Sequence, residues 1–333
     1  MKKLLLSVLV LGCAEPGELA QVDQALGCSD IWCGMNSSKL GAIYTHQFRL
    51  DGKPSEDGFF ITKAVKGSKT YELDVQHGTF VFHGESGTLT DGAVVGAMIA
   101  IKHVDGSEYL IRIDSSERTP YWVNADAEVW TYELSWSLLQ GGLPKIWQNV
   151  CTNPPGKTVD TPTMNGNSAV VFEGDHVDGA TKTVSADPNI FNIGCAGHAL
   201  AKMALTGHSG AGVKAAGITT TVEQRQTFLK MVTAVYCGDG TPFTVPGTKL
   251  DWSSDQGWLP YYYREGSLEA RWTANGPSCI DTLRLEKGDP TGGGVFPDGV
   301  EAAILEHCQP PPKCNTSDRE SFDGHYLVSA APY

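Results

Sequence analysis

The stretch that decides the fold class runs from Ala97 to Ile113 and reads AMIAIKHVDGSEYLIRI. Two largely apolar runs, 97–104 and 108–113, flank the dipeptide Asp105-Gly106. Asp-Gly between apolar runs is a strong signal for a tight β-hairpin, because both residues tolerate the left-handed backbone that a two-residue turn requires. The pattern therefore predicts two antiparallel strands joined at Asp105-Gly106.

The same kind of pattern surrounds this hairpin. Residues 71–75 alternate apolar and polar side chains, and 79–82 follow after His77-Gly78. Residues 130–136 read WTYELSW, with aromatic side chains at alternate positions. Alternation with a period of two is typical of strands that bury one face. We therefore predict an antiparallel sheet over about 41–137, built as a barrel or a sandwich of meandering strands.

Helical signals come later in the chain. Residues 151–190 contain Asn153-Pro154-Pro155-Gly156 and Ala186-Asp187-Pro188, which predicts a loop-rich segment. Residues 196–205 are rich in helix formers, and 221–233 has apolar residues at helical spacing after Thr221, a suitable N-cap. A short helix is expected near 299–307. The predicted fold class is α+β: an N-terminal antiparallel β-rich part, then an antiparallel helix pair and further short strands.

Composition narrows the function classes. The chain has 333 residues, 38 of them glycine and 18 proline, and a formal charge of −13. A net-acidic surface repels phosphate backbones, so nucleic acid is not expected as a partner. Gly292-Gly293-Gly294 lacks the Lys-Ser/Thr of a P-loop, and no cofactor is predicted.

The N-terminus has the pattern of an export signal. Lys2 and Lys3 precede an apolar run over 4–11, which is too short to span a bilayer. Val10-Leu11-Gly12-Cys13 matches a bacterial lipobox, so we expect a signal peptide over 1–12 and a lipid on Cys13 that anchors the chain to a membrane outside the cytoplasm, on the outer membrane or the periplasmic face. The alternative is an ordinary cleaved signal with Cys13 incidental. Cleavage would remove two lysines and take the formal charge from −13 to −15.

The cysteine count agrees with export. Once Cys13 carries lipid, an even number of cysteines remains: Cys28, Cys33, Cys151, Cys195, Cys237, Cys279, Cys308 and Cys314. An oxidising compartment favours their pairing, so four disulfides are expected. For eight cysteines, about 105 pairings are possible and spacing alone does not choose among them.

Two segments point to a family. Gly194-Cys195-Ala196-Gly197 is followed by Ala199-Leu200-Ala201-Lys202, and later the chain reads MVTAVYCGDGT over 231–241. Together they resemble the ADYC domain, found mainly in myxobacterial envelope proteins and named for an Ala-Asp-Tyr-Cys motif. The resemblance extends from about residue 70 through Cys279, and the family has no characterised activity. The motif corresponds here to Ala234, Val235, Tyr236, Cys237, Gly238, Asp239 and Gly240, so Val235 replaces its aspartate.

The resemblance also implies disulfide pairs. Family members carry cysteines where this chain has Met203 and Phe228, and their joint replacement implies that these positions face each other on antiparallel helices. The family pattern then implies a bond between Cys195 and Cys237, linking the helix pair. With that pair set, the expected remaining bonds are Cys151–Cys279, Cys28–Cys33 and Cys308–Cys314.

Catalytic and metal sites have weaker support. Cys237 follows a predicted helix C-terminus, where the dipole disfavours a thiolate, so a disulfide is the favoured role. His198 and His208 do not match zinc spacing, and no metal site is predicted. His198 and Asp239 remain as acid/base candidates. A cluster of aromatic residues is the best candidate for a binding face, since Trp and Tyr suit sugars and protein partners, although the same residues would also fill a core: Trp252, Trp258, Tyr261, Tyr262, Tyr263 and Trp272.

These observations predict a division of the chain and a function. The expected parts are a signal peptide (1–12), a tether with the Cys28/Cys33 loop (13–40), a β-rich part (41–150), an ADYC core with the helix pair (151–290) and a C-terminal segment (291–333). The predicted function is a non-enzymatic binding or structural module for an envelope protein or glycan. The alternative is an extracytoplasmic hydrolase, which a pocket with convergent titratable groups near the helix pair would favour.

Overall fold

A computed structural model describes residues 38–151, 164, 166–244, 250–257, 267–285, 300–316 and 322–331. The fold is mostly antiparallel β, with a smaller helical part, so the expected α+β class is confirmed only in that coarse sense. Within these residues, no helix combines the length and apolar character needed to cross a membrane.

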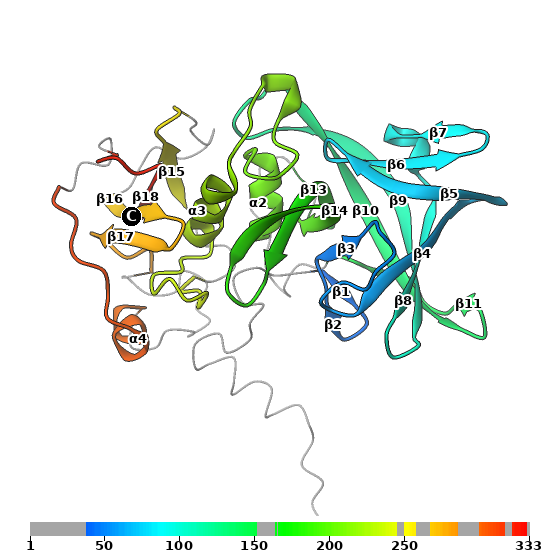
Figure 1. The fold of residues 1–333 in the computed structure, drawn as a ribbon, viewed down its shortest axis with the longest axis horizontal. Coiled ribbons are helices and arrows are strands. Elements are labelled where there is room, and N and C mark those ends of the chain that lie inside the picture. Colours follow the sequence, from blue (N-terminus) through cyan, green and yellow to red (C-terminus); the bar gives the residue numbers. More distant parts are fainter. Residues whose placement is uncertain are drawn as a thin grey trace, which may run out of the picture.

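The larger sheet has twelve strands and a main path β3-β14-β13-β10-β9-β8-β4-β5-β6-β7, with β11 and β12 both paired to β10. Its strands are β3 (Gln47–Arg49), β4 (Phe59–Lys66), β5 (Lys69–Gln76), β6 (Thr79–Gly84), β7 (Gly87–Leu89), β8 (Met98–His103), β9 (Glu108–Pro120), β10 (Glu128–Gln140), β11 (Leu143–Pro144), β12 (Gln148–Asn149), β13 (Ser168–Asp178) and β14 (Thr183–Cys195). The sheet curves strongly, so that β5 and β6 lie against β13 (Figure 1).

Strand β13 separates two apolar cores. Ala169 and Val171 belong to the core inside the curved sheet, whereas Val170 and Phe172 belong to the core on its other face. This division follows from the strand itself, because successive side chains point to opposite faces. The same strand therefore ties the β-rich region to the helical region.

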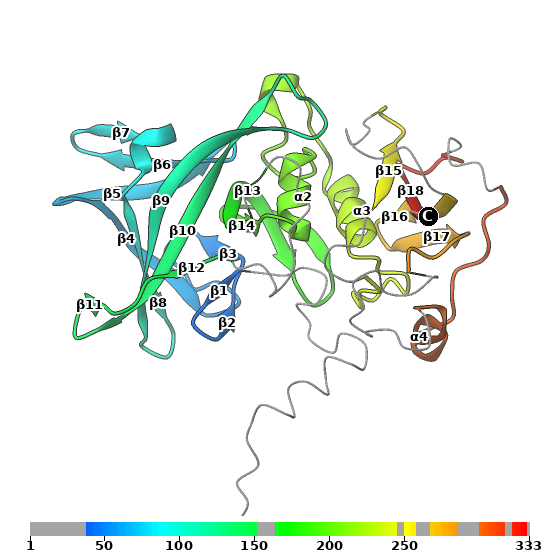
Figure 2. The same ribbon diagram turned by 180° about the vertical axis from the view of Figure 1, so that it is seen from behind.

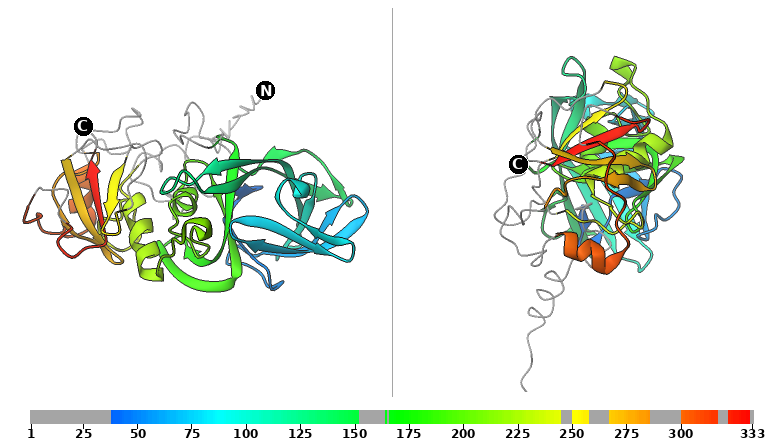
Figure 3. Two further views of the ribbon diagram at one scale, coloured as in Figure 1. Left: turned by 90° about the horizontal axis from the view of Figure 1, so that it is seen from above. Right: turned by 90° about the vertical axis from the view of Figure 1, so that its left-hand side faces the viewer.

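The helical layer packs on β13 and β14. It consists of α2 (Ala199–Leu205) and α3 (Val222–Val232), and a second sheet of order β15-β18-β16-β17 lies on the far side of α3 (Figure 2). The strands of that sheet are β15 (Asp251–Ser254), β16 (Ser267–Thr273), β17 (Gly276–Ile280) and β18 (Leu327–Ala331). Figure 3 shows the resulting order of curved sheet, helices and small sheet along the long axis.

The remaining elements are short. They are β1 (Lys39–Leu40), β2 (Ile43–Tyr44), η2 (Asp91–Val94), η3 (Lys214–Ala216) and α4 (Val300–His307).

Several local predictions are confirmed. The hairpin at Asp105-Gly106 joins β8 to β9, although its turn is longer than two residues and only Gly106 of the pair has a positive φ (93°). The turn at His77-Gly78 joins β5 to β6 with positive φ at both residues (53° and 73°). Helix α3 begins after Thr221, whose side chain accepts a hydrogen bond from Gln224 N–H, while Thr221 N–H donates to Gln224 Oε1. This capping box satisfies two backbone donors that a helix start otherwise leaves open.

The loop-rich prediction for 151–190 is wrong over much of its length, because β13 and most of β14 lie there. The prolines predicted a loop, but Pro188 lies within β14. It lies at a register shift, where Asp187 pairs with Gly174 and Phe191 pairs with Glu173. A proline is tolerated at such an irregularity because no ladder hydrogen bond is required of its nitrogen.

The predicted bond between Cys195 and Cys237 is also wrong. Cys195 is bonded to Cys151, Cys237 to Cys308, and Cys279 to Cys314. The expected pairs Cys151–Cys279 and Cys308–Cys314 fail with it, while Cys13, Cys28 and Cys33 lie outside the described residues.

Sheet geometry accounts for the observed partner of Cys195. It ends β14 opposite Ala169, and Cys151 follows β12, which pairs with β10 beside β13. The two cysteines therefore meet across the sheet. Met203 and Phe228 both lie fully buried in one core. The family pattern at these two positions nevertheless did not predict the disulfide partner of Cys195.

Candidate functional site

The family motif follows directly from the end of α3. Ala234 has φ 52°, a left-handed conformation that a non-glycine residue rarely adopts. Its N–H donates to Met231 O, and Val235 N–H donates to Lys230 O, which together form a Schellman motif. The turn directs the following Tyr236 into the core, where only 1% of the residue is exposed.

A buried network surrounds the Tyr236 hydroxyl. The hydroxyl donates to Glu269 Oε1 at 2.5 Å, and Glu269 forms an ion pair with Arg284 at 2.9 Å. The Arg284 and Glu269 side chains are 1% and 0% exposed. Burial, together with the neighbouring Glu269 carboxylate, raises the pKa of Tyr236 well above its ordinary value, so this hydroxyl stays protonated.

Arg284 also stabilises the end of α3. Its Nη2 donates to Met231 O at 2.8 Å and its Nη1 donates to Val232 O at 3.4 Å. The carbonyl groups of a last helical turn have no partner within the helix and carry partial negative charge, so a guanidinium satisfies both needs. Tyr236, Glu269 and Arg284 thus fasten α3 to the small sheet.

The rest of the motif is structural as well. Cys237 is bonded to Cys308 beside α4. A Cβ added at Gly238 would lie 2.4 Å from Asn275 O, and one added at Gly240 would lie 2.3 Å from Ala180 O. Both positions therefore require glycine for close backbone approach.

The two predicted acid/base residues are not brought together. Asp239 is half-exposed and pairs with His307 at 2.6 Å, at the end of α4. His198 is 8% exposed at the N-cap of α2, where burial lowers its pKa to about 3 and keeps the imidazole neutral. Neither residue forms a site with the other.

The predicted aromatic face is not supported by its described members. Trp252 is 5% exposed and packs edge-on against Phe228, with ring centroids 5.2 Å apart. Trp272 is 1% exposed, and its indole N–H donates to Ser329 Oγ at 2.7 Å. These two side chains fill the core, which was the alternative role predicted for them. Outside the described residues lie Trp258, Tyr261, Tyr262 and Tyr263.

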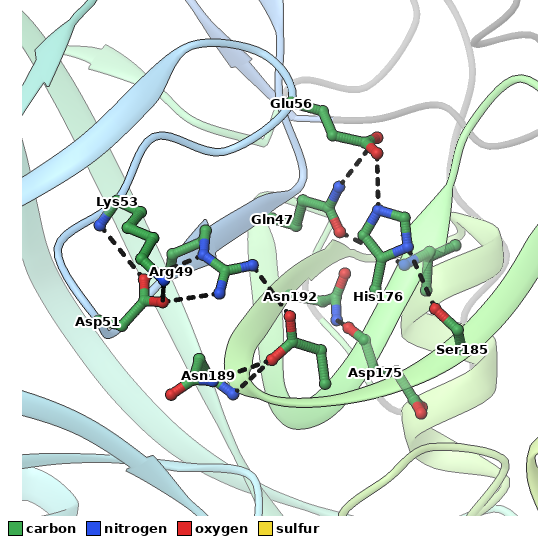
Figure 4. Close-up of polar contacts among 12 residues, drawn as sticks. Gln47, Arg49, Asp51, Lys53, Glu56, Asp175, His176, Ser185, Asn189 and Asn192 are labelled. Atoms are coloured by element: carbon green, nitrogen blue, oxygen red, sulfur yellow. Dashed lines mark hydrogen bonds and ion pairs between the residues drawn. The ribbon is translucent and has the colours of Figure 1, made fainter.

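A polar cluster that the sequence did not reveal lies at the outer edge of the β13–β14 hairpin (Figure 4). His176 Nε2 lies 2.9 Å from Glu56 Oε1, and His176 Nδ1 lies 3.4 Å from Ser185 Oγ. Serine hydrolases activate their nucleophile with the same three groups in the same order: a hydroxyl next to an imidazole, and the imidazole next to a carboxylate. Ser185 is directly opposite His176 in the sheet register.

A second ion-pair group lies next to it. Arg49 at the end of β3 contacts Asp51 at 2.7 Å and Asp187 at 2.9 Å, and Asn189 N–H also donates to Asp187. Beneath it, the fully buried Asp175 pairs with Arg225 of α3 at 2.9 Å. Burial raises the pKa of Asp175 to about 6, although the Arg225 guanidinium acts in the opposite direction.

Glu56, His176 and Ser185 are separated by up to 129 positions in sequence and match no local motif, so only the strand register brings them together. A groove of about 960 Å³ lies between β4 and β5–β6, and a smaller one of about 240 Å³ lies beside α4. Neither groove is lined by the cluster. In the described part of the chain, no group of three or more His, Cys, Asp or Glu side chains is placed to hold a metal ion.

The fold and the motif define a disulfide-linked, mostly antiparallel β protein whose helix layer is locked between two sheets. Bonds of this kind persist in oxidising surroundings and indicate an extracytoplasmic location. Residues 91–286, more than half of the chain, match the ADYC domain, and the chain belongs to that family. No curated protein and no solved structure matches this chain.

Proposed function

We propose that this protein is a lipid-anchored envelope module that binds or scaffolds without catalysing a reaction. The observation that supports this proposal is the state of the family motif. Its hydroxyl is buried and bonded to Glu269, its cysteine is in a disulfide, and its glycines serve backbone contacts. Motif residues that are buried or bonded to other parts of the fold are not free to react with a substrate, which favours a scaffold role.

The anchor is the second part of the proposal. It rests on the lipobox pattern at Val10–Cys13 and on disulfides that indicate export. Intact-mass measurement should show acyl chains on the wild-type protein and none on Cys13→Ser, and the substitution should lower the share of the protein in the membrane fraction of a bacterial host. A wild-type protein whose intact mass shows no acyl chains would refute the lipid anchor.

Binding is tested with the folded chain immobilised against a glycan array and against detergent extracts of the envelope. The proposal expects a saturable ligand that is recovered chemically unchanged after incubation. The matched comparison is the same chain after disulfide reduction, because loss of the fold should abolish a specific interaction. Silence in both assays would count against the binding role.

A second candidate function is a serine hydrolase, which the contacts among Ser185, His176 and Glu56 favour. In that reaction His176 would take the Ser185 proton during attack on a carbonyl carbon, and Glu56 would stabilise the resulting imidazolium. The position is unusual for a nucleophile, since Ser185 lies in an extended strand whose backbone belongs to the β13–β14 ladder. A strand offers fewer free N–H groups for an oxyanion than a strand-to-helix turn does.

A fluorophosphonate probe separates the two functions. A hydrolase would be labelled at Ser185, and Ser185→Ala and His176→Ala would both abolish labelling. Ser86→Ala, at an exposed serine of the β6–β7 turn, is the matched control and should leave labelling intact. The non-enzymatic proposal expects no labelling of any variant.

A further inference from the structure

Three of the four exposed large apolar side chains of the described residues lie on one edge of the molecule, and the fourth, Leu305, lies on α4. Val104, Leu143 and Ile146 are 64%, 71% and 67% exposed. Val104 lies on the β8–β9 turn, Leu143 begins β11 directly after the β10–β11 turn, and Ile146 follows β11. The turns are adjacent because β8, β9, β10 and β11 pair in that order. Figures 1 and 2 place both turns at the lower edge of the curved sheet.

Further residues at these turns suit a water–lipid boundary. Lys145 is exposed between Leu143 and Ile146, and Trp147 follows with its ring 4.1 Å from the Arg112 guanidinium. Lysine can bury its stem in apolar surroundings while its ammonium stays hydrated, and tryptophan favours the headgroup level of a bilayer. We call Val104, Leu143, Ile146 and the adjoining Lys145 the hairpin-tip surface.

The described chain also begins at this edge. Lys39 N–H donates to Val150 O at 3.5 Å, and a methyl group added at Gly41 would lie 3.4 Å from the Tyr109 hydroxyl. Tyr109 is the second residue of β9, close to the β8–β9 turn. A lipid on Cys13 would therefore connect to the fold beside the hairpin-tip surface.

We infer that the hairpin-tip surface inserts its apolar side chains into the headgroup region of a lipid bilayer. The choice of occupant rests on the proposed anchor, because a tethered protein meets the bilayer at high effective concentration. A second protein copy fits less well. Three side chains on two separate turns cover much less than the roughly 800 Å² per partner that stable interfaces bury.

The charge pattern is compatible with a neutral lipid surface. The protein as a whole carries −13, which disfavours attraction to anionic lipid. At the tips, Lys102 is paired with Glu108 at 2.7 Å, and the exposed Asp105 and Lys145 carry opposite charges, so little net charge remains there. Apolar insertion should therefore depend weakly on salt and should occur on zwitterionic vesicles.

The test uses the proposed mature chain, residues 13–333, with Cys13→Ser so that no acyl chain contributes. Flotation with phosphatidylcholine vesicles should recover this chain, and salt at about 0.15 M or 1 M should change recovery by less than about twofold. Leu143→Asp/Ile146→Asp should lower vesicle affinity by about tenfold or more, since each carboxylate opposes insertion. Both positions are exposed, so circular dichroism should confirm an unchanged fold.

The matched control is Ser86→Asp/Thr88→Asp on the β6–β7 turn at the upper edge in Figure 1, which adds the same charge and should change affinity by less than about twofold. The inference is overturned if the Cys13→Ser chain does not float, or if the tip variant floats like wild type. A different outcome would also overturn it: sedimentation shows that the Cys13→Ser chain is a dimer, the Leu143→Asp/Ile146→Asp variant is a monomer, and neither protein binds vesicles. An unmodified Cys13 in cells would refute only the lipid anchor. Flotation would still show whether the hairpin-tip surface binds a bilayer.

Discussion

Glu269 is the residue on which the family motif depends for its charge balance. It accepts a hydrogen bond from the Tyr236 hydroxyl and forms an ion pair with Arg284, and all three side chains are buried. Removing one partner from such a network leaves the other charge desolvated without compensation. The motif therefore depends on a carboxylate that lies outside it in sequence.

Glu269→Gln should lower the free energy of unfolding by about 3 kcal/mol at neutral pH, because Arg284 would remain buried without a counter-charge. The matched control is Glu128→Gln, whose side chain is 48% exposed and pairs with Arg118 at 3.5 Å. That change should cost less than about 0.5 kcal/mol. Urea unfolding measures both, and equal costs would contradict a stabilising role for the buried pair.

His208 gives the fold a pH dependence with a definite sign. It stacks on Phe228 with centroids 4.2 Å apart and lies 2.8 Å from the Tyr326 hydroxyl, and burial lowers its pKa to about 3. Between about pH 6.5 and 3 the unfolded chain binds a proton at this position and the folded chain does not. Stability contributed by neutral His208 is therefore lost as pH falls through this window.

His208→Gln should reduce the loss of stability between pH 6.5 and 4.5 by up to about 1.4 kcal/mol per pH unit relative to wild type. His83→Gln, at a histidine whose side chain is 43% exposed, is the control and should keep the wild-type slope. Urea unfolding at several pH values gives the slopes. Identical slopes for wild type and His208→Gln would show that His208 does not contribute to the pH dependence.

At the scale of elements, α3 is the best predicted and the disulfides are the worst. Local signals predict α3: an N-cap at Thr221, an acidic residue at Glu223 and apolar residues at helical spacing. The structure confirms that the helix begins directly after Thr221. Disulfide partners depend instead on which strand ends lie side by side. Cys151 and Cys195 are 44 positions apart and meet only because β12 and β13 both pair with β10.

Peptide mapping without reduction should recover Cys195 linked to Cys151, Cys237 to Cys308, and Cys279 to Cys314. The Cys151–Cys195 bond closes a loop of 44 residues, which corresponds to about 4 kcal/mol in the chain-entropy model. Cys151→Ser/Cys195→Ser should therefore lower the unfolding midpoint in urea. A peptide joining Cys195 to Cys237 would instead restore the bond implied by the family pattern.

At the scale of the whole molecule, the two cores share β13 and depend on each other. The core inside the curved sheet includes Ala169, Val171, Phe191 and Ile193, all C-terminal to residue 150. A fragment that ends at 150 would expose the surface these residues cover. The β-rich half and the helical half should therefore fold as one unit.

Residues 38–150 expressed alone should be unfolded, whereas 38–333 should unfold in a single transition, because the shared strands couple both cores. Circular dichroism and urea titration of the two fragments provide the comparison. A cooperative transition in 38–150 would instead support the boundary at 150 expected from the sequence.

Sequence patterns were sufficient to predict the features whose signals are local: the Asp105-Gly106 hairpin, the Thr221 cap of α3, the family motif and the tendency to form disulfides. Turn and cap chemistry acts over a few residues, so it can be read without knowing the fold. The three-dimensional fold was needed to identify the partners of Cys195 and Cys237, the burial of Trp252 and Trp272, and the contacts of His176 with Glu56 and Ser185. Those depend on strand order and register, which arise from the joint packing of residues far apart in the chain.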